Sequence, residues 1–190
     1  MVAEHVPRGW TVEEYLQLEL ASPVKHEYVD GHVYAMAGGT QAHSELGVVA
    51  VALLRTLVRG GPCRAFNSDL KVQVSPRIYF YPDASVSCDP RDRHPDAREI
   101  QYPALVLEVT SLSTADYDRG EKFDQYCTSA SLREYVLVDH RRVAVEVRTR
   151  GDDGAWSARH YGSGERSSSC TACDATVAAD AFYEDVPLEG

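Results

Sequence analysis

The sequence predicts an α/β fold in which a single mixed β-sheet is flanked by helices. Two nearly continuous apolar runs, ALVLEVTS and REYVLVDH, are typical of strands that are buried on both faces. The segment between them has a helical composition, so the three together form a βαβ unit with a parallel strand pair and a right-handed crossover. Alternating segments on either side of this unit add antiparallel strands, which makes the sheet mixed.

Length and composition indicate one globular domain, residues 1–190, because 44% of the residues are hydrophobic and 25% are charged. The net charge of −10 argues against a tight, non-specific nucleic-acid binder, since Lys and Arg supply most of the affinity for phosphate. No apolar run approaches the roughly 20 residues that cross a bilayer, and MVAEHVPRGW lacks the apolar core of a signal peptide. We therefore expect a cytoplasmic protein without membrane contact, whose five cysteines are reduced thiols.

The first segments are expected to form a helix and a hairpin. TVEEYLQLEL carries Glu in its first turn, and Thr11 is a candidate N-cap for this helix. Asp30-Gly31 is a strong signal for a two-residue hairpin turn. It predicts two short strands, Glu27–Val29 and His32–Met36.

A long helix and several strands follow the hairpin. QAHSELGVVAVALLRTLVR is apolar enough to lie against a sheet, and it begins after Thr40, a plausible N-cap, and ends at GGP. CRAFNSDLKVQVS and IYFYPDASVSC are each expected to be one strand, and the polar segment DPRDRHPDAREIQYP after them is expected to be a loop. After the βαβ unit, the sequence predicts further strands or short elements in RVAVEVRTR, WSARHYG and ATVAADAF.

Two carboxylates interrupt strands that are otherwise apolar. Asp83 follows Pro82 in YFYPDASV, and Glu108 lies within LVLEV. A buried charge is costly unless it is paired or binds a metal ion. If the two strands are neighbours, the carboxylates meet at one edge of the sheet, where their repulsion would either raise the pKa of one of them or recruit a cation. Oxygen ligands favour Mg²⁺ or Mn²⁺.

Lys122 is the candidate third member of this site. It lies in the helix that follows the strand of Glu108, from which its amine could reach back over the strand. There it would orient a water molecule or offset negative charge in a transition state. The alternative is a routine surface pair with Asp118, four residues earlier on the same helix.

Four segments resemble the Uma-two family of putative restriction endonucleases, which belongs to the PD-(D/E)XK nuclease-like superfamily: KHEYVDGHVYAMAGGTQAHSEL, YPDASV, LVLEVTSLSTADYDRGEKFDQY and REYVLVD. The resemblance runs from about Trp10 to Phe182. It implies a single nuclease-like domain with a restriction-endonuclease-like core and added antiparallel strands. It also implies a homodimer, and Mg²⁺- or Mn²⁺-dependent cleavage of DNA.

The resemblance also assigns roles to individual residues. Pro82-Asp83 is similar to the superfamily's PD, which makes Asp83 a metal ligand, and Glu108 is similar to the acidic residue of the second half-motif. The backbone carbonyl of Val109 would be a further metal ligand. Thr110 stands where the superfamily usually has its lysine, so the resemblance implies that Lys122 supplies the amine from the helix instead.

Three further positions have competing interpretations. Glu27 is similar to the superfamily's additional acidic residue, and the alternative is a charged flank of the hairpin. His43 is a possible site contact or a surface residue at the start of a helix. Cys170 and Cys173 form one CxxC pair, which supplies only two of the four ligands of a structural zinc site, so zinc is not favoured.

Two main functions compete. The first is a metal-dependent endonuclease in which Asp83, Glu108, Lys122 and Glu27 act on a phosphodiester. The second is a non-catalytic nuclease-fold protein that acts in binding or assembly, which the acidic charge and the displaced lysine favour; it predicts that the side chains of Asp83, Glu108 and Lys122 point apart. A metal-dependent hydrolase of a small phosphate ester is a third, weaker alternative.

Overall fold

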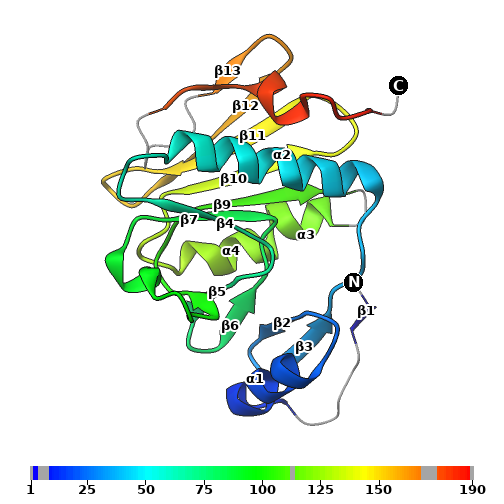
Figure 1. Ribbon diagram of the computed structural model, residues 1–190, viewed down its shortest axis with the longest axis vertical. Coiled ribbons are helices and arrows are strands. Elements are labelled where there is room, and N and C mark those ends of the chain that lie inside the picture. The colour runs from blue at the N-terminus through cyan, green and yellow to red at the C-terminus, as the bar shows by residue number, and fades with distance from the viewer. Residues whose placement is uncertain (1, 4–8, 112–113, 168–174, 189–190) are drawn as a thin grey trace.

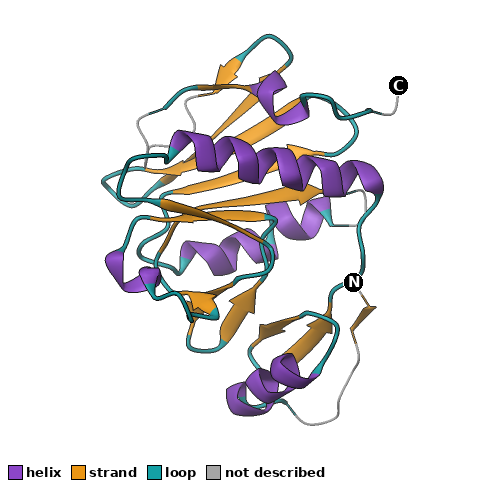
Figure 2. Ribbon diagram, viewed as in Figure 1, coloured by secondary structure: helices purple, strands orange, loops and turns teal. Residues whose placement is uncertain are grey.

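A computed structural model describes residues 2–3, 9–111, 114–167 and 175–188 of the chain. In this part of the chain the strands form two six-stranded sheets and one two-stranded pair, with helices packed on them (Figures 1 and 2). The α/β class with mixed sheets and flanking helices is thus confirmed. The single sheet expected from the sequence is instead two.

The first sheet has the strand order β1-β3-β2-β6-β5-β8. All of its pairs are antiparallel except β5 with β8, which is parallel. Its strands are β1 (Val2–Ala3), β2 (His26–Val29), β3 (His32–Ala35), β5 (Lys71–Ser75), β6 (Ile78–Phe80) and β8 (Glu99–Ile100).

Helix α1 (Val12–Ala21) packs on this sheet through aromatic rings. Its predicted N-cap is confirmed, because the Thr11 hydroxyl accepts from the Glu14 N–H at 3.2 Å and the Glu14 carboxylate accepts from the Thr11 N–H at 3.0 Å. The Tyr15 ring of α1 stacks on the Tyr28 ring of β2, with centroids 5.0 Å apart. The hairpin between β2 and β3 is also confirmed: Gly31 has φ +94°, which glycine adopts without steric cost.

The second sheet has the strand order β12-β11-β10-β9-β7-β4 and contains the predicted parallel pair, β9 with β10. Its other pairs are antiparallel. Its strands are β4 (Arg64–Asn67), β7 (Ala84–Ser87), β9 (Pro103–Thr110), β10 (Glu134–Asp139), β11 (Ala144–Arg150) and β12 (Trp156–Gly162). The remaining short elements are a 3₁₀ turn η1 (Pro90–Arg93), the pair β13 (Arg166–Ser167) and β14 (Val177–Ala178), and a 3₁₀ turn η2 (Ala179–Tyr183).

Helices cover both faces of the second sheet (Figure 1). Helix α2 (Gln41–Leu57) places Leu46 and Leu54 in a core with Leu105 and Leu107 of β9. Helices α3 (Ala115–Arg119) and α4 (Glu121–Cys127) lie on the other face, where Tyr126 packs in a second core with Val106. None of the helices in the described ranges is long and apolar enough to cross a membrane.

Two segments that were each expected to be one strand are divided between the two sheets. CRAFNSDLKVQVS forms β4 in the second sheet and β5 in the first, with a turn between them. IYFYPDASVSC forms β6 in the first sheet and β7 in the second, and Tyr81-Pro82-Asp83 connects them. Because Pro has no N–H to donate to a ladder, Pro82 ends one strand before the next begins. Asp83 therefore lies in a bend at the sheet crossing, not within a strand.

The crossover helix is likewise divided. Residues 115–127 form α3 and α4, which meet at Gly120, whose φ of −105° and ψ of −104° are not helical. Thr114 precedes α3 but makes no side-chain capping hydrogen bond to it. Its hydroxyl instead accepts from the Ser111 N–H at 3.1 Å, so this residue fixes the loop between β9 and α3.

The expectation that all cysteines are reduced is wrong for one pair. Cys63 and Cys88 form a disulfide, because β4 and β7 are antiparallel neighbours and Arg64 pairs with Ser87 directly beside the two cysteines. Nothing in the local sequence places these strands side by side, so the pairing depends on tertiary structure. Cys127 is a free thiol. Cys170 and Cys173 lie outside the described residues.

Candidate active site

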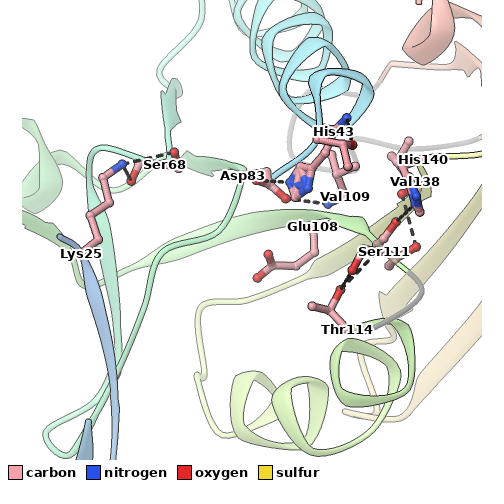
Figure 3. A network of polar contacts seen from close by, with 12 residues as sticks. Lys25, His43, Ser68, Asp83, Glu108, Val109, Ser111, Thr114, Val138 and His140 are labelled. Atoms are coloured by element: carbon pink, nitrogen blue, oxygen red, sulfur yellow. Dashed lines mark hydrogen bonds and ion pairs between the residues drawn. The ribbon is translucent and has the colours of Figure 1, made fainter. Parts of the chain in front are cut away.

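A cavity of about 260 Å³ lies where β2, β7 and β9 approach the N-terminus of α2 and the helices α3 and α4. Its lining includes every residue that the sequence singled out for the site. These are Glu27, His43, Asp83, Glu108, Val109 and Lys122. Residues from five separate parts of the chain therefore converge on one place, and Figure 3 shows several of them around the ends of α2 and β9.

Asp83 is held at the crossing between the sheets by two contacts. Its Oδ2 accepts from the backbone N–H of Val109 at 2.7 Å, and its Oδ1 lies 3.0 Å from His43 Nε2 (Figure 3). Burial raises the pKa of the Asp83 carboxyl, although the Val109 hydrogen bond and His43 oppose this shift. The register of β7 on β9, in which Ala84 pairs with Leu107, places Asp83 next to Glu108 at the end of the ladder.

Glu108 projects from β9 on the side of the sheet away from α2. Its neighbours Leu107 and Val109 pack in the core beneath α2, so the alternation of a strand directs Glu108 toward α4. It is 5% exposed, and burial raises the pKa of its carboxyl well above the usual range, with Lys122 opposing this. The hydroxyl of Tyr126 lies 3.5 Å from Glu108 Oε1.

Lys122 forms ion pairs with two of the four acidic residues that line the cavity. Its Nζ lies 2.8 Å from Glu108 Oε1 and 3.0 Å from Glu27 Oε1. Burial alone would lower the pKa of this amine, but Glu108 and Glu27 raise it well above its usual value, so Lys122 is a cation. The alternative of a surface pair with Asp118 is wrong, because Lys122 is 5% exposed and its ion pairs are with Glu108 and Glu27.

Glu27 and His43 are both site contacts. Glu27 lies on β2 and is 2% exposed, so it is not a solvated flank of the hairpin; its Oε1 also accepts from the Tyr81 N–H at 3.3 Å. His43 lies in the first turn of α2, whose predicted N-cap Thr40 accepts from the His43 N–H at 3.2 Å. That cap fixes the start of the helix and so directs the His43 ring toward Asp83.

Sequence reasoning did not assign a site role to Asp118 and His140, which line this cavity, or to Tyr126, which contacts Glu108. Burial raises the pKa of the Asp118 carboxyl. Residues 118, 122 and 126 are spaced by four, which in the single helix that the sequence predicts would place them on one side. This spacing is the signal that could have found two of them, although Gly120 divides the segment into α3 and α4. His140 follows β10, and its Nδ1 lies 2.7 Å from the Thr110 carbonyl oxygen.

The donor set of the cavity fits a hard divalent cation. Mg²⁺ in proteins commonly takes one or two carboxylates and completes its shell with water and substrate phosphate. Asp83 and Glu108 would supply the carboxylates, and Val109, whose backbone carbonyl is the further ligand expected from the sequence, also lines the cavity. Among the described residues no group of three or more His, Cys, Asp and Glu side chains is arranged to hold a metal ion. Such an ion would therefore depend on water and substrate for its remaining ligands.

Three comparisons with known proteins give consistent results. A family model, Uma2, described as "Putative restriction endonuclease", matches residues 12–179. Two proteins of Synechocystis are relatives: "Uncharacterized protein slr1290" is 45% identical over 81% of each chain, and "Uncharacterized protein sll1609" is 31% identical over 77% of this chain and 84% of the other.

A solved structure shares the fold. It is described as "a putative nuclease belonging to DUF820" from Anabaena variabilis, and it superimposes with a TM-score of 0.76. The match covers 92% of this chain and 97% of the other, at 15% sequence identity. At that identity the likeness shows that the architecture is shared.

Proposed function

Because the chain belongs to the Uma2 family, we propose that it is a metal-dependent endonuclease that hydrolyses phosphodiester bonds, with DNA as its substrate. One observation carries the proposal: Asp83, Glu108 and Lys122, which lie on different elements, line one cavity, and Lys122 Nζ lies 2.8 Å from Glu108 Oε1. The family description and the fold shared with a described nuclease support the same class of reaction.

Asp83 and Glu108 would hold Mg²⁺ or Mn²⁺, with the Val109 carbonyl as a further ligand. A bound divalent ion polarises the scissile phosphate and lowers the pKa of an attacking water molecule. The Val109 N–H and His43 hold the Asp83 carboxylate in place. Because the carboxylate is already ordered, binding of the ion would cost less conformational entropy. Burial raises the pKa of both carboxyls, and a divalent cation bound between them would favour their charged forms.

Lys122 would stabilise negative charge that develops on the phosphate, and Glu27 would keep its amine in place. A fixed cation in a buried site stabilises a transition state more than the same charge in water does. The 3.0 Å contact with Glu27 gives Lys122 a second anchor, so its amine stays at the cavity when Glu108 turns to a metal ion. In this arrangement Lys122 of α4 supplies the amine that the superfamily usually takes from a lysine at the position of Thr110.

The competing hypothesis of a non-catalytic protein predicts that these side chains point apart. They instead surround one cavity, and Lys122 contacts two of the acids directly. This convergence favours the catalytic hypothesis. The net charge of −10 still implies that binding to nucleic acid is weak.

The test is the nicking of supercoiled plasmid at low salt in the presence of Mg²⁺, of Mn²⁺ or of EDTA. We expect metal-dependent nicking by the wild type, and loss of at least about 100-fold in Asp83→Asn and Glu108→Gln, which keep the side-chain shape but remove the charge. Asp152→Asn is the matched control, because Asp152 is an exposed turn residue outside the cavity. No nicking by the wild type, or equal nicking by all four proteins, would overturn the proposal.

A further inference from the structure

A second cavity, of about 840 Å³, lies between α1 and the edge of the first sheet formed by β5 and β8. Apolar walls come from Leu16 and Leu20 of α1 and from Leu70 before β5. Tyr81 is the one residue that it has in common with the lining of the proposed active site. It is therefore a separate site, and the proposed function does not use it.

Lys71 of β5 is the unusual residue of this cavity. It is 6% exposed and lines the cavity, yet in the described part of the chain its amine makes no hydrogen bond or ion pair at contact distance. Burial lowers the pKa of this amine, while Glu99 and Glu19 at longer range oppose the shift. Most of the side chain is buried, but the ammonium opens to the cavity, where it is only partly hydrated and has no contact partner among the described residues.

The acidic residues around Lys71 are already engaged with other donors. Glu19 accepts from the His26 N–H and from the Tyr81 hydroxyl, and Glu99 accepts from the Gln101 side chain at 3.0 Å. Asp92 accepts from Ser87 and from the N–H groups of residues 101 and 102, and Asp69 pairs with Lys25. Each carboxylate of the lining therefore has a donor that is closer than Lys71.

A second cation borders the same space. Arg98 is exposed and lines the cavity, and its charge contributes to lowering the pKa of Lys71, which means that the two cations repel each other. Among the described residues Arg98 has no ion pair at contact distance. Arg91 completes this side, but its guanidinium is committed to Asp89 at 2.7 Å. An anion between Lys71 and Arg98 would neutralise both charges.

We propose that this cavity is a binding site for a small organic anion, with its phosphate or carboxylate between Lys71 and Arg98. The apolar side chains of α1 and Leu70 would contact the remainder of the ligand. The planar guanidinium of Arg98 suits two oxygens of one acid group, and the ammonium of Lys71 suits a third contact as a point charge. A volume of about 840 Å³ is within the range of small-molecule sites.

Isothermal titration of the wild-type protein with inorganic phosphate, phenyl phosphate and benzoate tests this site. We expect saturable binding of phenyl phosphate or benzoate, and weaker binding of inorganic phosphate, which lacks an apolar body. Which of the two aromatic acids binds tighter distinguishes a phosphate ligand from a carboxylate ligand. Removing a charge-assisted contact should weaken binding about tenfold or more in Lys71→Met and in Arg98→Ala. Arg159→Ala, an exposed arginine on β12, is the matched control.

Thermal unfolding without ligand separates this role from a structural one. If Lys71 serves to bind an anion, Lys71→Met removes a partly desolvated charge that has no contact partner, and the midpoint of unfolding should stay the same or rise. If Lys71 instead serves the fold by attracting Glu99, the midpoint should fall. The proposal would be overturned if the wild type did not bind these anions or if Lys71→Met bound them as tightly as the wild type. It would also be overturned if Lys71→Met had a lowered midpoint of unfolding and Arg98→Ala bound the anions as tightly as the wild type.

Discussion

At the scale of single residues, the ion pairs of Lys122 with Glu27 and Glu108 can be tested through stability. Lys122→Met leaves two buried carboxylates without their cation, and breaking a buried pair in this way typically costs about 3–5 kcal/mol. We expect a loss of that size in urea unfolding at pH 7. Lys122 opposes the raised pKa of Glu108, so without Lys122 the pKa of this carboxyl in the folded state rises further above its value in the unfolded state. The folded state then binds a proton more readily than the unfolded state does, and the loss of unfolding free energy becomes smaller as the pH falls.

The matched variant for this test is Lys122→Met combined with Glu108→Gln, which also removes one of the stranded charges. The double variant should recover part of the stability that the single variant loses, since the two residues are in direct contact. Additive losses would show that the contact carries no coupling energy, and that Lys122 acts only through its packing.

Two of the candidate site residues could be predicted from the sequence because each breaks a local rule. Asp83 and Glu108 place charges among apolar residues, and both line the cavity together with Lys122. Asp118, Tyr126 and His140 break no such rule. An acid on a helix or a histidine after a strand is ordinary in sequence, and only packing against Glu108 or the cavity distinguishes them.

At the scale of elements, the turn between β2 and β3 depends on a glycine. Gly31 has φ +94°, and an added Cβ would lie 3.3 Å from the Cα of Gly9, so both the backbone and the space disfavour a side chain. Gly31→Ala should lower the free energy of unfolding by about 1–2 kcal/mol, measured in urea. Gly47→Ala is the contrasting variant: it lies inside α2 with no atom within 4 Å of the added Cβ, and it should raise stability by up to about 1 kcal/mol. Equal effects at the two positions would contradict this account.

Elements defined by local chemistry were predicted well, and those defined by tertiary pairing were not. The cap at Thr11, the hairpin at Asp30-Gly31 and the parallel pair of β9 with β10 follow from short-range patterns. The crossing at Pro82-Asp83 was visible as an irregularity, but nothing in the local alternation shows that the strands on its two sides belong to different sheets.

At the scale of the whole molecule, the disulfide between Cys63 and Cys88 ties β4 to its neighbour β7. It closes a loop with a sequence separation of 25, for which a cross-link contributes about 2–4 kcal/mol. Reduction, or Cys63→Ser with Cys88→Ser, should therefore lower the midpoint of urea unfolding. Cys127→Ser is the control, because this cysteine is a free thiol, and it should leave the effect of a reductant unchanged. A midpoint that does not respond to reductant would argue against the cross-link.

The net charge of the whole molecule determines its long-range electrostatic interaction with a polyanion such as DNA. With 29 acidic and 19 basic side chains, the protein repels DNA at long range, so the proposed association would depend on a few local contacts and on the proposed divalent ion. We expect Glu108→Gln, which should bind without cleaving, to show a dissociation constant weaker than about 1 µM for a 30-base-pair duplex at 0.15 M salt. Few phosphate contacts also mean that the logarithm of the affinity falls shallowly with the logarithm of the salt concentration. Fluorescence anisotropy over a salt series measures both quantities. Tight binding with a steep slope would contradict this expectation, because it would require a local cationic surface strong enough to outweigh the net negative charge.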